Sequence, residues 1–229
     1  MYDDEHCRRR YRELMGQRPD LFTNPAECPT QVVVDPIAIA DVQRVVAARR
    51  KAEGYDARDV RVGVLAEDHY IGVVIRDAVR FSDGEPGLYN RVVATGGVVA
   101  LPILGDDLAL IRIYRHPPRR WFLEAPQGLL APGTDAARQA ARELEEEMGA
   151  QVRHITPLGH LYTSTALTSE RLTLFAAQIE GTGKPQLSEG IEAIERIAKS
   201  DIDQYIADGT ICDGPTISVI ARARIKGIL

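Results

Sequence analysis

The chain has 229 residues, 45% of them hydrophobic and 27% charged, an ordinary composition for a folded globular protein with one large domain or a domain and an appendage. Its net charge of -5 excludes a general attraction to nucleic acid or anionic membranes, so a phosphorylated ligand would need local arginines or a metal ion. No apolar run reaches the roughly 18 residues of a membrane span, the charged amino terminus is unlike a signal peptide, and Cys7, Cys28 and Cys212 are expected to be reduced thiols in a cytoplasmic protein.

The amino-terminal part of the chain is predicted to be helical. Residues 3–18 form a polar helix that ends where Pro19 blocks its continuation. A loop with two prolines and the short apolar run QVVVDP follow. A second helix is expected after Asp35 as its N-cap, with Pro36 at the first helical position and Gly54 as its C-cap.

From about residue 60 the sequence changes to segments rich in Val and Ile. These segments are expected to be strands, and they are VRVGVLA, YIGVVIRDAVRF, YNRVVATGGVVALPIL and LALIRIYRH. The turn signals SDGEPG, TGG and GDD interrupt them. We therefore expect a meander of antiparallel strands.

The second half of the chain alternates between helix and strand. A central helix is predicted for residues 135–148, and the strands HITPLGHLYTS and ERLTLFAAQIE follow it. The segment GTGKPQLSEG is expected to be a long polar loop, and DIDQYIADG and PTISVIARARIKGI are expected to be closing helices. Strands, one central helix, and then further strands and helices indicate an α+β fold.

The central helix carries a cluster of acidic residues. On a helical wheel Glu143, Glu146 and Glu147 share one flank of the buried stripe, whereas Glu145 lies on the other side. Each like-charged pair at this spacing costs a few tenths of a kcal/mol. The cluster is therefore either a solvated acidic face or a site where a divalent cation bridges carboxylates, and Mg²⁺ prefers a few carboxylates, waters and a substrate phosphate.

The acidic cluster is part of a longer pattern that resembles the box of the Nudix hydrolase family. The matching residues are Gly128, Arg142, Glu143, Leu144, Glu146, Glu147, Gly149 and Ala150. One position departs, because Thr134 stands where the family has a Glu that supports the loop and the conserved Arg. We expect Thr134 or the adjacent Asp135 to cap the helix instead, and Gly149 to end it in the αL conformation.

The flanking segments resemble the ADP-ribose pyrophosphatase branch of the family. IRIYRHPPRRWFLEAPQG is similar to the segment that leads into the box, with matches at Arg115, Glu124, Pro126 and Gly128. LYTSTALTSERLTLFAA is similar to a later segment, although Thr165-Ala166 replaces the usual Pro-Gly, and DGTICDGPTISVIARARI resembles the closing helix. The resemblance covers about residues 70–225 and leaves the first 55 residues unexplained.

The resemblance implies a metal-dependent hydrolysis of a pyrophosphate bond. It assigns Glu143, Glu146 and Glu147, with the backbone carbonyl of Gln127, as ligands of Mg²⁺ or Mn²⁺. The general base of this branch lies on a mobile loop that corresponds to KPQLSEGIEAIERI. Glu189 is the first choice for the base and Glu192 the second, and if neither serves, Glu146 or Glu147 would activate the water.

The resemblance also implies which residues contact the substrate. Arg115 is expected to bind the phosphates, with Glu124, Gly128 and Tyr162 as further substrate-binding residues. Arg119 and Arg120 either steer anions toward the site or are solvated surface residues. Trp121 either stacks on a base, as Tyr162 would, or packs in the core. The five histidines have no metal-ligand spacing and are expected to be structural or exposed; they are His6, His69, His116, His154 and His160.

The fold implied by the resemblance is α+β, with a mixed sheet sandwiched between helices. We expect a helical extension over 1–58, strands that promote a homodimer over 59–98, and the Nudix domain over 99–229. The leading functional hypothesis is a Mg²⁺-dependent pyrophosphatase acting on ADP-ribose or a nucleotide sugar, with no nucleic acid or membrane partner. The alternatives are a pathway-specific nucleoside di- or triphosphate pyrophosphatase and a non-catalytic nucleotide-sensing module.

Overall fold

The structure, a computed structural model, describes residues 3–70 and 72–229. The chain separates into two compact units, each with its own sheet and its own apolar core. Unit 1 comprises residues 1–94 and 164–169, and unit 2 comprises residues 95–163 and 170–229. None of the helices in the described residues is both long enough and apolar enough to span a bilayer.

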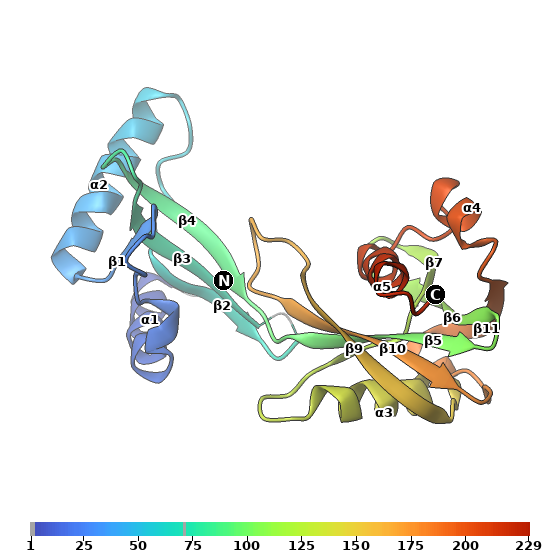
Figure 1. Cartoon of the computed structure of the whole chain (residues 1–229). Coiled ribbons are helices and arrows are strands. Elements are labelled where there is room, and N and C mark those ends of the chain that lie inside the picture. Colours follow the sequence, from blue (N-terminus) through green and yellow to red (C-terminus); the bar gives the residue numbers. More distant parts are fainter. Residues whose placement is uncertain (1–2, 71) are drawn as a thin grey trace. The chain divides into compact units, whose positions relative to one another are not determined.

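Unit 1 is an antiparallel sheet packed against two helices (Figure 1). Its central strand β3 pairs antiparallel with β1, β2 and β4. The elements are α1 (Asp4–Gln17), the 3-10 turn η1 (Pro19–Leu21), β1 (Gln31–Val33), α2 (Pro36–Ala52), β2 (Gly63–Asp68), β3 (Gly72–Arg80) and β4 (Pro86–Val93).

Both amino-terminal helices lie where the sequence predicts them. The Asp3 carboxylate caps α1 by accepting from the His6 N–H at 2.8 Å. The Asp35 carboxylate caps α2 by accepting from two backbone N–H groups of its first turn. Helix α2 ends at Ala52, and Gly54 follows with a φ of +79°, a left-handed conformation that glycine adopts without strain.

A segment from later in the chain adds to the edge of the unit 1 sheet. In residues 164–169, the Leu167 carbonyl accepts from the Val92 N–H at 2.8 Å, and the Ser169 N–H donates to the Val92 carbonyl at 3.0 Å. These bonds satisfy backbone groups of β4 that would otherwise lie unpaired on an edge strand.

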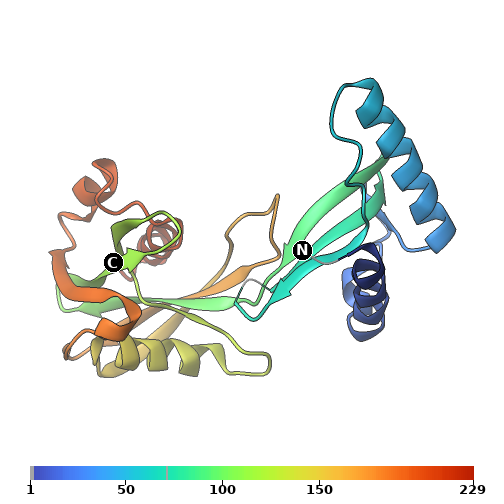
Figure 2. The same ribbon diagram turned by 180° about the vertical axis from the view of Figure 1, so that it is seen from behind.

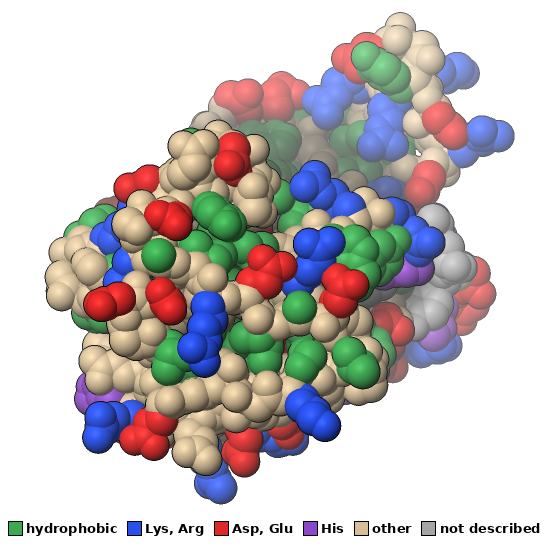
Figure 3. Space-filling model, turned by 90° about the vertical axis from the view of Figure 1, so that its right-hand side faces the viewer, with side chains coloured by type: hydrophobic (Ala, Val, Ile, Leu, Met, Phe, Trp, Pro, Cys, Tyr) green, Lys and Arg blue, Asp and Glu red, His purple; other side chains and the backbone are tan. Residues whose placement is uncertain are grey.

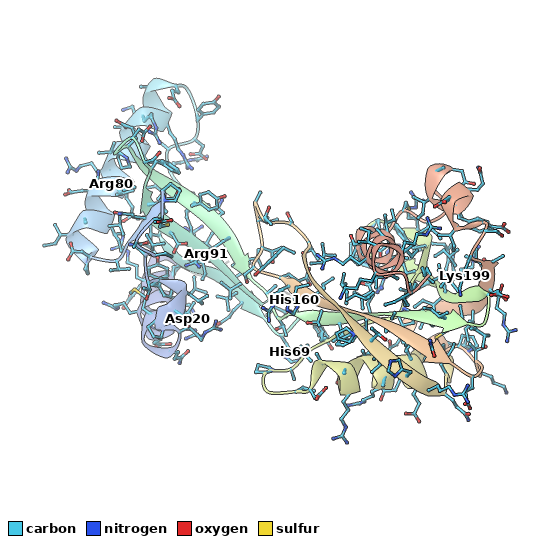
Figure 4. All side chains as sticks on the ribbon, in the orientation of Figure 1. Asp20, His69, Arg80, Arg91, His160 and Lys199 are labelled. Carbon is cyan, nitrogen blue, oxygen red and sulfur yellow. The ribbon has the colours of Figure 1, made fainter. Side chains whose placement is uncertain are left out.

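A buried polar network connects helix α1 to the sheet. The Tyr11 hydroxyl donates to Asp77 at 2.5 Å, and Arg91, labelled in Figure 4, donates its Nε–H to the same carboxylate at 2.6 Å. Asp77 is only 1% exposed, so both donors are needed to compensate its desolvation. Burial, together with the Asp77 charge, raises the pKa of Tyr11, which keeps its hydroxyl protonated as a donor.

Replacing Tyr11 by Phe is expected to destabilise the protein by about 1–3 kcal/mol, because it removes one donor from a buried carboxylate. Chemical denaturation of the variant and the wild type measures this difference. Tyr55→Phe is the matched control, since Tyr55 is 70% exposed and should change stability little. Equal loss in both variants would contradict a specific role for the network.

Unit 2 is a mixed sheet with the strand order β11-β6-β5-β10-β9 (Figures 1 and 2). Strand β7 pairs with β6 and β8 pairs with β5, while β10 runs parallel to β5. The elements are β5 (Gly97–Leu104), β6 (Asp107–Arg115), β7 (Arg120–Glu124), β8 (Gln127–Leu129), α3 (Ala136–Met148), β9 (Val152–Tyr162), β10 (Arg171–Ile179), the 3-10 turn η2 (Leu187–Glu189), β11 (Ile191–Ala198), α4 (Ile202–Ala207) and α5 (Gly214–Ile225).

Helices cover both faces of the unit 2 sheet, as Figure 1 shows for α3 and α5. Alternate residues of β5 serve the two faces: Val99 and Leu101 belong to the core beneath α5, whereas Val98 and Ala100 belong to the core beneath α3. This confirms the α+β fold with a mixed sheet between helices.

On the face seen in Figure 3, acidic and basic side chains are interspersed with apolar ones.

Two predictions about the strands were wrong. The TGG turn does separate β4 from β5, but these strands belong to two different sheets, so the strands between residues 60 and 115 do not form a single antiparallel meander. The segment KPQLSEGIEAIERI is also not all loop, because β11 pairs antiparallel with β6 over most of its length. Ile191 and Ile197 are buried in this strand, and their burial compensates the ordering of the backbone.

Candidate active site

Helix α3 is held by caps at both ends. The Asp135 carboxylate accepts from the Arg138 N–H at 3.0 Å, so Asp135 rather than Thr134 is the N-cap. Gly149 ends the helix with a φ of +60°. Leu144 and Met148 are fully buried on the face that packs against the sheet. The packed face therefore fixes where the neighbouring carboxylates point.

Glu147 is a buried acid at the edge of this packed face. Its side chain is 3% exposed, and its Oε2 atom is buried without a hydrogen-bond partner. Burial, together with the charges of Glu143 and Glu189, raises its pKa to about 8, although Arg115 and the backbone N–H of Gln127 act in the opposite direction. A cation bound here would stabilise the charged Glu147 carboxylate, because this carboxylate is buried and lies among like charges.

Glu143 lies against a glycine of strand β8. A Cβ atom on Gly128 would overlap the Glu143 carboxylate, so only glycine leaves room for that side chain. Gln139 donates its Nε2–H to Glu143 Oε1 at 2.6 Å, and burial together with the charges of Glu146 and Glu189 raises the pKa of Glu143. Strand β8 therefore touches both carboxylates, one through Gly128 and the other through the backbone of residue 127.

The other acidic residues of α3 are exposed. Glu146 accepts from the Nε–H of Arg142 at 2.8 Å, while Glu145 lies on a different side of the helix, as the wheel predicts. In the part of the chain that the structure describes, no three acidic, His or Cys side chains converge into a ready-made metal site. Glu146 would have to leave Arg142 to join Glu143 and Glu147 around a cation.

The two candidate bases lie in different surroundings. Glu189 is exposed on η2, its Oε1 accepts from the Gln186 amide at 3.1 Å, and its charge acts on both Glu143 and Glu147. Glu192 lies on β11, where its carboxylate accepts from the Nε–H of Arg112 at 2.7 Å. Of the two candidates, only Glu189 lies near enough for its charge to act on Glu143 and Glu147.

A second polar cluster begins with an ion pair between β6 and β7. Arg115 donates from Nη2 to Glu124 at 2.6 Å, and Glu124 is only 2% exposed. Burial opposes the charge of Arg115, but the ion pair outweighs it and raises the pKa of the guanidinium. Burial also raises the pKa of Glu124, with Arg115 opposing that shift. The Gln127 amide bridges Glu124 and Asp213, with both distances at 3.2 Å.

Asp213 and Thr216 were not predicted as site residues. Asp213 caps helix α5 by accepting from the Thr216 N–H at 2.8 Å and from the Thr216 hydroxyl at 2.6 Å. The same hydroxyl accepts from the Ala125 N–H at 3.0 Å, which ties the segment before β8 to the helix. The Asp-Gly-Pro-Thr start of a helix was a signal for the cap, but its contact with Gln127 links residues 86 positions apart and has no local signature.

The cluster of Arg115, Glu124, Gln127 and Asp213 lines a cavity of about 460 Å³. Its walls combine the Arg115–Glu124 pair with further acids and with apolar side chains. The lining residues are Gly97, Val98, Arg115, Pro117, Pro118, Phe122, Glu124, Gln127, Gly128, Leu129, Glu170, Leu172 and Asp213. Because strand β8 borders the cavity and also touches Glu143 and Glu147, a ligand in the cavity would lie beside the carboxylate cluster.

The remaining aromatic and basic candidates do not line the cavity. Tyr162 is 53% exposed at the end of β9 and does not line the cavity. The core interpretation of Trp121 was wrong: this residue is 41% exposed, contacts Tyr114 edge-to-face and lies beneath Arg112. Arg119 and Arg120 are exposed.

The histidines and cysteines take no part in this site. Four histidines are exposed, among them His69 and His160, which Figure 4 labels, and His6 is half-buried in helix α1. The three cysteines form no disulfide among the described residues: Cys7 is buried, Cys28 half-buried and Cys212 exposed. The groups that gather around β8 are therefore carboxylates, an amide and one guanidinium.

The carboxylate cluster fits a hard divalent cation. Glu147 presents a buried oxygen without a donor, and burial together with two neighbouring carboxylates raises its pKa. Carboxylate oxygens are the ligands that Mg²⁺ prefers, and a cation would remove the repulsion that the cluster otherwise carries.

Comparisons with known proteins give matches to a family model, to curated relatives and to a solved structure. The family model described as NUDIX domain matches residues 94–213. A methanol dehydrogenase activator from Bacillus methanolicus is 25% identical over 72% of this chain and 94% of its own length. An ADP-ribose pyrophosphatase from Bacillus subtilis is 26% identical over 61% of this chain and 78% of its own. A crystal structure of an ADP compounds hydrolase superposes with a TM-score of 0.63, 24% identity, and coverage of 73% and 93% of the two chains, which shows the shared fold.

Proposed function

Because this chain belongs to the Nudix family and is a hydrolase of the pyrophosphatase type, we propose that it hydrolyses a nucleoside diphosphate joined to a sugar, such as ADP-ribose or a nucleotide sugar. The products would be two monophosphates, and Mg²⁺, or else Mn²⁺, would be the cofactor. The observation that carries this proposal is the buried Glu147 carboxylate, which strand β8 connects to the Arg115-lined cavity.

Each member of the carboxylate cluster receives a role in this proposal. Glu143, Glu146 and Glu147, with the Gln127 carbonyl, would hold the divalent ion. When bound, such an ion neutralises phosphate charge and lowers the pKa of a water. Glu189, whose charge already acts on Glu143 and Glu147, would accept the proton of the attacking water.

Residues of the cavity would bind the substrate. Arg115 uses Nε and Nη2 for Glu124, so its remaining N–H donors can reach a phosphate oxygen. Glu124 would hold the guanidinium in place, and Gly128 would let the diphosphate approach the backbone of β8. Tyr162 lies outside this cavity, so the geometry supports no stacking role for it there.

The charges of the cavity favour a sugar over a terminal phosphate. Arg115 and Glu124 neutralise each other, while Glu170 and Asp213 add two further carboxylates to the walls. These acids would repel a triphosphate and can accept hydrogen bonds from sugar hydroxyls. The triphosphate alternative therefore has less support, and the non-catalytic alternative has less still, because every metal-binding carboxylate of the box is present.

A panel of substrates tests this function. We expect kcat/KM with Mg²⁺ to be at least about 100-fold higher for ADP-ribose and GDP-mannose than for ATP and GTP, because one repelled phosphate costs a few kcal/mol. Phosphatase-coupled release of inorganic phosphate measures the rates, and EDTA should abolish them. The neutralising variant Glu170→Gln should narrow the difference. A preference for triphosphates would favour the alternative hydrolase instead.

The assembly and the division of the chain remain proposals. We propose a homodimer that uses the strands of residues 59–98, by resemblance to the family. The boundaries 1–58, 59–98 and 99–229 likewise stay as proposed functional parts of the chain.

A further inference from the structure

The loop between β10 and β11 is attached to the carboxyl end of helix α3. The last carbonyls of a helix lack partners within the helix. Here the Gly183 N–H donates to the Met148 carbonyl at 2.8 Å, and the Gln186 N–H donates to the Glu147 carbonyl at 3.0 Å. The loop therefore completes the end of the helix that carries the acidic cluster.

Close backbone contact fixes this attachment. A Cβ atom on Gly149 would lie 2.9 Å from the Cα of Gly183, so the two backbones can approach only as glycines. At its other end the loop is held by Gly190, whose carbonyl accepts from the Tyr114 N–H at 3.0 Å. The segment that carries Glu189 is thus fixed at both ends.

Within this loop, Gln186 bonds to the backbone of Glu147 and to the side chain of Glu189. Its backbone N–H binds the Glu147 carbonyl, and its side-chain Nε2–H donates to Glu189 Oε1 at 3.1 Å. The Gln186 Oε1 atom is buried and has no hydrogen-bond partner. Turning the amide over would place this oxygen against a carboxylate oxygen, so the orientation with the donor toward Glu189 is the favourable one.

We propose that Gln186 is a positioning residue that holds the Glu189 carboxylate relative to Glu147. This inference rests on the proposed function, in which a water oxygen bonds to phosphorus, the bridging P–O bond breaks and Glu189 accepts the water's proton. Gln186 itself touches no reacting atom.

Gln186→Ala tests the proposal kinetically. We expect kcat for ADP-ribose to fall at least about 10-fold, because a hydrogen bond to a charged group is lost, while KM and Tm stay unchanged. Gln178→Ala is the matched control, since Gln178 is an exposed glutamine on β10. In a Glu189→Gln background, Gln186→Ala should lower kcat less than twofold, because the carboxylate that it positions is gone.

Three results would overturn the proposal. An equal loss of kcat in both backgrounds would mean that Gln186 acts on the structure and not through Glu189. An unchanged kcat in Glu189→Gln would remove the base that Gln186 is proposed to hold. Crystals of Gln186→Ala with the Glu189 carboxylate still in its wild-type orientation would exclude positioning directly. If the wild type hydrolyses no member of the panel, the proposed function fails, and the crystallographic comparison still decides whether Gln186 holds Glu189.

Discussion

Glu147→Gln will lower turnover by roughly 10³-fold or more without unfolding the protein. Glu147 is the most buried carboxylate of α3, it lies at the Gln127 backbone, and the proposed cation depends on its charge. Glutamine keeps the size of the side chain but cannot replace a carboxylate oxygen as a ligand. The measurement is kcat for ADP-ribose at saturating Mg²⁺.

Although Glu147→Gln lowers turnover, it should not lower the stability of the metal-free protein. The folded-state pKa of Glu147 is raised to about 8, so the fold disfavours the charged carboxylate. In the metal-free wild type, the contribution of Glu147 to the free energy of unfolding is complete below the pKa of the carboxyl in the unfolded chain. This contribution is lost as the pH rises toward the pKa in the folded protein. At pH 8 with EDTA, Glu147→Gln should therefore melt at or above the wild-type Tm. Added Mg²⁺ should raise the Tm of the wild type but not that of Glu147→Gln.

Glu145→Gln serves as the control for this experiment. Glu145 is exposed on another side of α3, so its replacement should leave both turnover and the Mg²⁺ effect on Tm unchanged. Wild-type turnover in Glu147→Gln would remove this residue from the site. Loss of activity accompanied by a lower metal-free Tm would instead indicate a folding defect.

Gly128→Ala will lower turnover by about 100-fold with little loss of stability. The added methyl group would overlap the Glu143 carboxylate, which ends a flexible side chain and can move to another rotamer. The fold can therefore absorb the substitution, whereas Glu143 would no longer lie where the proposed cation needs it. We expect the concentration of Mg²⁺ for half-maximal activity to rise as well.

Gly181→Ala is the matched control for Gly128→Ala. A Cβ atom on Gly181 meets nothing within 4 Å, and the residue has no positive φ, so alanine should be accepted there without effect. Unchanged turnover in Gly128→Ala would show that the Glu143 position beside β8 does not matter for activity. A large fall in Tm would mean that the methyl group disturbs the strand.

Local features of the sequence were sufficient to predict the helices and the acidic flank. Asp35 and Asp135 cap their helices as such residues do in isolation, and Gly149 ends α3 through its own backbone freedom. The wheel also separated Glu145 from the other acids. These predictions depend only on residues within one or two helical turns of each other, and the sequence shows such neighbours directly.

The remaining features depend on contacts between distant residues. The parallel pairing of β5 with β10 joins segments about 75 residues apart, and no property of either strand alone specifies the partner. The Gln127 contact with Asp213 and the docking of Gln186 onto the Glu147 carbonyl arise in the same way. The prediction that Trp121 packs in the core was wrong for a different reason. Its apolar surface is covered by Arg112 and Tyr114 instead of a core.

The strand-like addition of residues 164–169 to β4 affects how the protein can be divided into fragments. Unit 1 is assembled from two stretches of chain, so a fragment that stops at residue 94 would lack the Leu167 and Ser169 partners of Val92. Its edge strand would then present free backbone donors and acceptors to other molecules, a known route to aggregation. A soluble amino-terminal fragment therefore needs this six-residue segment grafted back, or a charged or proline substitution on β4 in its place.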